Sequence, residues 1–188
     1  MLRRLAPVFA LMLALFAVAC GSDDEGSGGS SGEGGPPIKI GASLPLTGEF
    51  SEPGKAAQQG YQVWEAMTNE GDGLIDGRKV KFTFRDDASN QNTVVADYTS
   101  LISRDKVDLL AGTFSSLLNI PASTVAERNK MLYVEPAGGA PEIFDRGYKY
   151  LFFAQQATAD KQGDLFAEWV LNLPEDKRPK TAAYPTLD

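Results

Sequence analysis

Two short segments hold the residues best suited to bind a small molecule. The segment GTFSS ends in Ser115 and Ser116, whose hydroxyls stand where a helical pattern begins. A helix start also offers free backbone N–H groups and the positive end of the helix dipole, so this segment suits a carboxylate or a phosphate. In the segment AGG, Gly138 and Gly139 would let a ligand approach the backbone closely. An ordinary helix cap and a tight turn would use the same residues.

Catalytic chemistry receives little support from the composition. The absence of histidine removes imidazole bases, Ser-His-Asp triads and histidine-based zinc sites. Cys20 is the single cysteine, so an internal disulfide and a cysteine metal cluster are excluded. Asp86 and Asp87 are adjacent on a predicted strand and point to opposite faces, so we expect them to cap a neighbouring loop rather than form a catalytic or metal-binding pair. We therefore expect no enzyme activity, no cofactor and no metal.

Strand and helix patterns alternate from residue 38 onward, and these elements must position the two segments. Strands are predicted at 38–44, 79–87, 107–112, 131–138 and 148–155, and helices at 54–71, 92–105, 115–130 and 157–174. Pro121 should kink its helix or delay its start, and a sixth strand pattern opens at Lys180. The alternation predicts an α/β fold with a doubly wound parallel sheet. Ligands bind such sheets at the carboxyl ends of the strands, where both segments fall, together with the loop that contains Phe50.

The first 37 residues have the pattern of a targeting segment and a linker. Two arginines precede the apolar run LAPVFALMLALFAVA, which is shorter than the roughly 20 residues that span a bilayer. The run ends at Cys20 in AVAC, which resembles a lipobox, the site at which bacterial lipoproteins are acylated. We therefore expect a signal peptide over 1–19, and an acylated Cys20 with a flexible Gly/Ser/acidic tether over 20–37. A plain secretory signal cut near Ala19 is the alternative.

The remainder of the chain resembles the branched-chain amino acid receptor family, the type I periplasmic solute-binding proteins of ABC importers. The resemblance rests on an ordered series of segments, GASLPLTG, NEGDGLIDGRKV, LLAGTFSSLLNIPAS, YVEPAGGAPEI and ADKQG. It implies two α/β lobes that trap a solute between them. The N-terminal lobe would occupy 38–178, and 179–188 would begin a second lobe whose remainder is missing.

The resemblance also implies roles for the candidate residues. In the family, the loops that match the serine pair and the glycine pair hold the α-carboxylate and α-amino groups of an amino acid. An aromatic residue of the first loop lies against the side chain; it usually stands where this chain has Pro53, and Phe50 would replace it. Gly139 stands where serine or threonine is common, and Ala154 lies near a frequent arginine. These departures weaken an assignment to leucine, isoleucine or valine and leave other amino acids, urea, short amides and aromatic acids open.

The expected function is therefore solute capture outside the cytoplasmic membrane. We expect a lipoprotein anchored to the bacterial cell membrane that delivers an amino acid or a similar small polar solute to ABC permease subunits. A ligand-sensing module that acts in signalling is the alternative, and an extracytoplasmic enzyme is a third hypothesis that no nucleophile–base pair supports. The net charge of −7 argues against nucleic acid as a partner.

Overall fold

The structure is a computed structural model that describes residues 34–183, so the predicted signal peptide, Cys20 and nearly all of the tether lie outside the described residues. The main elements are β1 (Ile38–Leu44), α2 (Ser51–Glu70), β2 (Val80–Asp86), α3 (Gln91–Ser103), β3 (Leu109–Ala111), α4 (Ser116–Arg128), β4 (Tyr133–Glu135), β5 (Leu151–Phe153) and α5 (Asp164–Leu171). Three short 3₁₀ turns are η1 (Ile75–Gly77), η2 (Pro141–Ile143) and η3 (Glu175–Lys177). None of the described helices is long and apolar enough to cross a membrane.

All five strands are parallel and lie in the order β2-β1-β3-β4-β5. β1 and β2 pair along all seven residues, whereas β3, β4 and β5 have three residues each. β4 ends at Glu135 because the next residue, Pro136, has no N–H for the ladder. The chain runs outward from β1 in both directions, so the switch point lies at the carboxyl ends of β1 and β3. The predicted α/β class with a doubly wound parallel sheet is confirmed.

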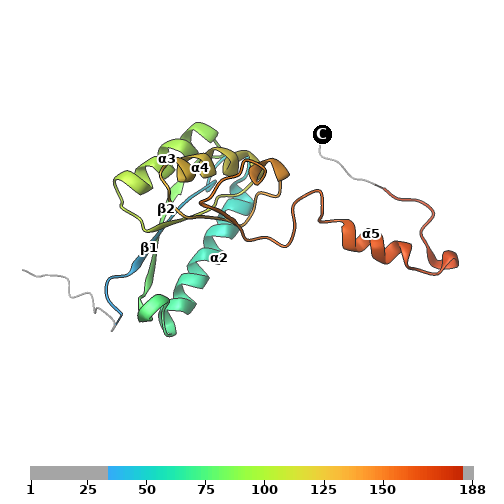
Figure 1. Ribbon diagram of the computed structural model, residues 1–188, viewed down its shortest axis with the longest axis horizontal. Coiled ribbons are helices and arrows are strands. Elements are labelled where there is room, and N and C mark those ends of the chain that lie inside the picture. Colours follow the sequence, from blue (N-terminus) through green and yellow to red (C-terminus); the bar gives the residue numbers. More distant parts are fainter. Residues whose placement is uncertain (1–33, 184–188) are drawn as a thin grey trace, which may run out of the picture. The chain divides into compact units, whose positions relative to one another are not determined.

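Helices cover both faces of the sheet, with α2 on one face and α3 and α4 packed together on the other (Figure 1). Every second residue of β1 joins a buried cluster on the α2 side: Ile38, Ile40, Ala42 and Leu44. Gly41 faces the other way, where a side chain would meet Leu101 of α3 at 3.2 Å. A second buried cluster lies under α3 and α4 and contains Tyr98 and Tyr133, whose rings meet edge to face at 5.5 Å.

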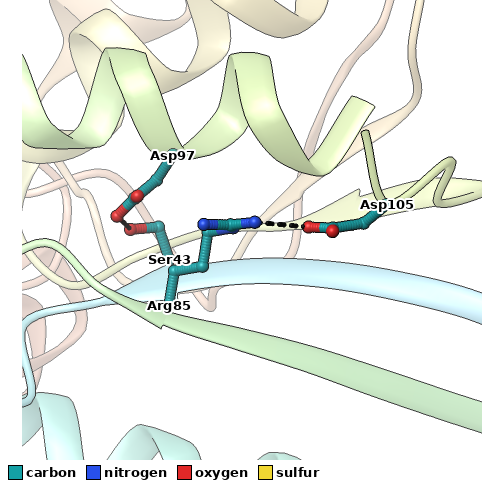
Figure 2. Close-up of polar contacts among 4 residues, drawn as sticks. All are labelled: Ser43, Arg85, Asp97 and Asp105. Carbon is teal, nitrogen blue, oxygen red and sulfur yellow. Dashed lines mark hydrogen bonds and ion pairs between the residues drawn. The ribbon is translucent and has the colours of Figure 1, made fainter. Parts of the chain in front are cut away.

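A polar tie fixes α3 near the carboxyl ends of β1 and β2 (Figure 2). The hydroxyl of Ser43 in β1 donates to Asp97 in α3 at 2.8 Å, and Arg85 in β2 forms an ion pair with Asp105 at 2.7 Å. Burial raises the pKa of Asp97, although the hydrogen bond from Ser43 and the charge of Arg85 oppose that shift. Because Ser43 is fully buried, this tie sets how α3 lies over the strand ends that carry the candidate site.

The strands β3, β4 and β5 are shorter than predicted, and the structure differs from the expectations at three further places. α4 begins at Ser116, so Pro121 does not delay its start and lies inside the helix. α5 begins at Asp164 rather than at residue 157, because the preceding residues form turns. Residues 180–183, the described part of the strand pattern that opens at Lys180, form no strand; they are exposed and make no backbone hydrogen bond to another described segment. A strand pattern alone does not produce a strand without a neighbour to pair with.

Candidate functional site

The start of α4 is an uncapped helix N-terminus with a buried hydroxyl beside it. Ser115 is the N-cap residue, yet its side chain makes no capping hydrogen bond, and its Oγ is buried without a partner among the described residues. Its φ of 73° and ψ of 149° belong to a region that glycine normally occupies. The start of α4 therefore combines free helix N–H groups with a strained residue whose buried hydroxyl has no partner among residues 34–183.

Asn119 holds the segment that leads into α4. Its buried side chain donates from Nδ2 to the carbonyl of Thr113 at 2.9 Å and to that of Ser115 at 3.0 Å. Its Oδ1 accepts from the hydroxyl of Tyr133 at 2.5 Å, and burial raises the pKa of Tyr133 well above its ordinary value, so this hydroxyl remains a donor. The backbone before α4 is thus held by Asn119 of α4, and the side chain of Asn119 is in turn held by Tyr133 of β4.

The loop after β4 uses most of its N–H groups inside the protein. The N–H groups of Ala137 and Gly138 donate to Oε1 of Glu135, the first at 2.6 Å. The N–H group of Ala140 donates to Oγ of Ser116 at 3.1 Å, which joins this loop to the start of α4. The carbonyls of Ala137 and Gly138 accept no hydrogen bond from the residues that the structure describes. This loop therefore offers acceptors beside the donors of α4.

The two aspartates after β2 each hold a different loop. Asp86 accepts from the N–H groups of Leu46 and Thr47 at 3.0 and 3.1 Å and from the hydroxyl of Thr47 at 2.8 Å, which fixes the loop after β1. Asp87 accepts from the hydroxyl of Thr113 at 3.0 Å, which fixes the segment before α4. The expectation that these residues cap neighbouring loops is confirmed.

The pKa values of these two carboxyl groups are shifted in opposite directions. Burial raises the pKa of Asp87 to about 6, and the hydrogen bonds from Thr113 and Ser89 offset this only in part. Burial would also raise the pKa of Asp86, but the hydrogen bonds from the loops around it outweigh that effect and hold the pKa below its ordinary value. Burial raises the pKa of Glu135 as well, against the hydrogen bonds that it accepts.

Phe50 immediately precedes α2 and lies beside the segment that leads into α4. Its ring meets the ring of Phe114 edge to face, with the centroids 5.8 Å apart. Its N–H group donates to Oγ of Ser89 at 3.0 Å, so the backbone at Phe50 is anchored to the loop after β2. Gly54 lets the first turn of α2 lie against the first loop, because a Cβ there would stand 2.1 Å from the carbonyl oxygen of Pro45.

The loops that carry the residues predicted from the sequence meet at one edge of the sheet. The loop of Phe50 reaches Phe114, and Ser116 is bonded to the loop after β4. Gly138 lies against Asn119, where a Cβ would stand 2.9 Å from Nδ2. Gly139 is more enclosed than expected, because its carbonyl accepts from the N–H group of Ala159 at 2.7 Å.

Sequence reasoning missed three residues that shape this site, Phe114, Asn119 and Glu135. Two of them carried a signal. Asn119 is a polar residue among the apolar positions of its helix, and Glu135 interrupts the apolar run MLYV before a proline. Buried polar groups need partners, so such interruptions point to hydrogen-bond networks. Phe114 stands beside the serines and carried no signal of its own.

Comparison with known proteins agrees with this architecture. Residues 37–182 match the family model described as periplasmic binding protein. The Leu/Ile/Val-binding protein BraC3 of Rhizobium johnstonii is 30% identical over 141 residues, which are 75% of this chain and 38% of the relative. An amino acid binding protein of Pseudomonas aeruginosa is 28% identical over 146 residues, which are 75% of this chain and 37% of the relative.

Solved structures share the fold. The branched-chain amino acid transporter substrate binding protein LivJ of Streptococcus pneumoniae, solved with isoleucine, gives a TM-score of 0.64 at 24% identity over 72% of this chain and 38% of that protein. A solute binding protein of an ABC transporter from Rhodopseudomonas palustris, solved with 3,4-dihydroxybenzoic acid, gives 0.61 at 23% identity over 71% and 35%. The chain thus spans less than two-fifths of the length of these relatives. The resemblance to branched-chain amino acid receptors is confirmed, and the chain belongs to the periplasmic binding protein family.

Proposed function

We propose that this chain provides the N-terminal lobe of an extracytoplasmic solute-binding lipoprotein, which captures an amino acid or a similar small polar solute for an ABC importer. One observation carries the proposal. The start of α4, with its free N–H groups, is joined by the hydrogen bond between Ser116 and Ala140 to the loop after β4, whose carbonyls at Ala137 and Gly138 accept no hydrogen bond from the described residues. A site of this kind suits a solute with opposite charges a few ångströms apart.

The two sets of backbone groups distinguish between the solute classes. An amino acid carries a carboxylate and an ammonium group on one carbon, so the start of α4 with Ser115 and Ser116 would take the carboxylate. The carbonyls of Ala137 and Gly138 would take the ammonium group. An aromatic acid would use the donors and leave these carbonyls unpaired, which costs binding free energy when the site closes. The relatives named for amino acids support an amino acid as the solute. The neighbour solved with 3,4-dihydroxybenzoic acid is the reason to include an aromatic acid among the probes.

The same proposal assigns a role to each part of the chain, including the parts outside the described residues. It assigns 1–19 to a signal peptide, 20–37 to an acylated Cys20 with a tether, 38–178 to the lobe and 179–188 to the start of a second lobe. A Gly-rich coil of this length spans about 20–25 Å, so the lobe would stand just off the membrane surface. In the complete protein the second lobe would close over the solute and exclude water, and the permease would receive the solute from it.

A thermal-shift screen of the 188-residue chain tests the solute class. The probes are L-leucine, L-alanine, urea, acetamide and 3,4-dihydroxybenzoate. A probe at 100 times its dissociation constant should stabilise the lobe by about 2.7 kcal/mol. A shift with the amino acids supports the proposal. A shift with dihydroxybenzoate alone would replace the amino acid by an aromatic acid, and no shift with any probe at millimolar concentration would count against solute capture by this lobe.

A double substitution tests the serines at the start of α4. Ser115→Ala with Ser116→Ala should weaken the best probe at least about tenfold, because a hydrogen bond to a charged group contributes about 1.5–3 kcal/mol. Ser103→Ala is the matched control, since Ser103 is an exposed helical serine far along α3. Calorimetry gives both affinities, and circular dichroism checks that the fold survives. Equal affinities in the double variant and the control would show that the two serines do not contribute to solute binding.

A further inference from the structure

Glu135 places a carboxylate in the interior, between the loop after β4 and the segment that leaves the sheet. The residue is fully buried. Its Oε1 accepts from the N–H groups of Ala137 and Gly138, and its Oε2 accepts from Nε2 of Gln155 at 2.7 Å. Both carboxylate oxygens are therefore in use, one toward the loop of the candidate site and one toward Gln155.

A turn that is held by a buried carboxylate costs more free energy than a turn that is held by a side chain at the surface. Neither of the ion pairs among residues 34–183 involves Glu135, so hydrogen bonds alone compensate its burial. A buried carboxylate without a cation costs free energy, and shorter side chains such as those of Asp, Asn and Ser fix ordinary turns at the surface. What a glutamate adds is reach, because it holds the loop and a second segment 20 residues away at the same time.

The segment that follows β5 is joined to this loop at two further points. The N–H group of Ala154 donates to the carbonyl of Glu135 at 2.9 Å, and the N–H group of Ala159 donates to the carbonyl of Gly139 at 2.7 Å. Gln155 lies between these two backbone contacts. A displacement of residues 155–159 would therefore act on the loop after β4 from both of its ends.

We propose that Glu135 is a positioning residue of the solute site, which holds the loop of Ala137 and Gly138 and couples it through Gln155 to the segment 155–159. This inference rests on the proposed function for its link to solute binding. The N–H groups of Ala137 and Gly138 donate to Glu135, which fixes the backbone of the loop, and the carbonyls of these two residues accept no hydrogen bond within residues 34–183. Movement of the chain beyond β5 then changes the geometry of the site through one carboxylate.

Amide exchange tests the coupling without any solute. We would measure the 188-residue chain residue by residue by NMR, comparing Gln155→Ala with Gln156→Ala, the exposed neighbouring glutamine that makes no hydrogen bond with the described residues. Gln155→Ala should speed exchange at Ala137 and Gly138 by about tenfold, although it removes neither of their own hydrogen bonds. Gln156→Ala should leave both unchanged. Unchanged exchange in both variants would overturn the coupling.

A charge swap provides the rescue. In the double variant Glu135→Gln with Gln155→Glu, the carboxylate stands on the other segment, and an amide oxygen remains for the loop N–H groups. Slow exchange at Ala137 and Gly138 should return to within about threefold of the original chain. A double variant as fast as Gln155→Ala would show that the pair does not couple the segments.

Calorimetry with L-leucine supplies the functional measurement. If the original chain binds L-leucine, Gln155→Ala should weaken binding by about tenfold and the swap should restore it. Faster exchange in Gln155→Ala with unchanged affinity for L-leucine would overturn the positioning role. If the original chain binds no L-leucine, the proposed amino acid class fails, and the exchange measurements still decide whether Glu135 couples the two segments.

Discussion

Replacement of Asp87 by asparagine should remove much of the pH dependence of stability between pH 4 and pH 6. Asp87 is fully buried, and its pKa rises from 3.8 to about 6 in the folded protein. Between these values the folded chain binds more protons at this site than the unfolded chain does. Its contribution to stability is therefore complete below pH 3.8 and is lost as the pH rises through 6. A difference of this size corresponds to about 3 kcal/mol.

The asparagine side chain can keep the contacts of Asp87. Its amide oxygen can accept from the N–H group of Ser89, and its NH₂ group can donate to the hydroxyl of Thr113. The variant should therefore fold and should gain stability relative to the original chain as the pH rises. Asp97 and Glu135 also have raised pKa values and add slopes of the same sign, so the difference between the two proteins isolates Asp87.

Urea denaturation followed by circular dichroism at pH 4, 5, 6 and 7 measures this difference. The free energy of unfolding of Asp87→Asn minus that of the original chain should grow with pH by up to about 3 kcal/mol and level off above pH 6. Asp160→Asn, at an exposed aspartate, is the control and should follow the original chain. Parallel curves for Asp87→Asn and the original chain would refute the reasoning that burial controls this carboxyl group.

Two further predictions concern the anchor and the glycine loop. Cys20→Ser should move the chain from the membrane fraction to the soluble fraction, and an intact mass that shows an unlipidated chain starting at another residue would contradict the anchor. Gly138→Ala should lower the free energy of unfolding by about 1–3 kcal/mol, because a Cβ would stand 2.8 Å from Ile143 and 2.9 Å from Asn119. Gly60→Ala, inside α2 with nothing within 4 Å, should instead raise it by up to about 1 kcal/mol. Equal effects at the two glycines in urea denaturation would refute the packing argument.

The order of the elements could be predicted because each pattern is local. Alternating Val80, Phe82 and Phe84 marked β2, and the apolar run before Gly112 marked β3. The lengths of β3, β4 and β5 could not be predicted, since a strand ends where its neighbour stops pairing with it. Pro136 marks such an end for β4, and the apolar run alone suggested a longer strand.

The start of α4 could also be predicted, because a helix start is a local feature. Ser115 and Ser116 stand at the start of α4 as expected. The hydrogen-bonded residues that support these serines could not be predicted, because tertiary packing determines their partners. Asn119 bonds to Tyr133, 14 residues away, and Glu135 bonds to Gln155, 20 residues away. Sequence patterns indicate that such polar residues are buried but not which groups they meet.

The backbone at Ser115 has a consequence for protein engineering. A φ of 73° with a ψ of 149° costs an L-residue about 1–3 kcal/mol, whereas glycine adopts it freely. Ser115 is therefore an early candidate when residues at positive φ are replaced by glycine to stabilise a protein. Ser115→Gly should raise the free energy of unfolding. The same change would delete the hydroxyl at the start of α4 that has no partner in the described part of the chain. If Ser115 holds the solute as proposed, thermostability and solute affinity should be in conflict at this position, and selection for heat resistance alone would weaken solute binding.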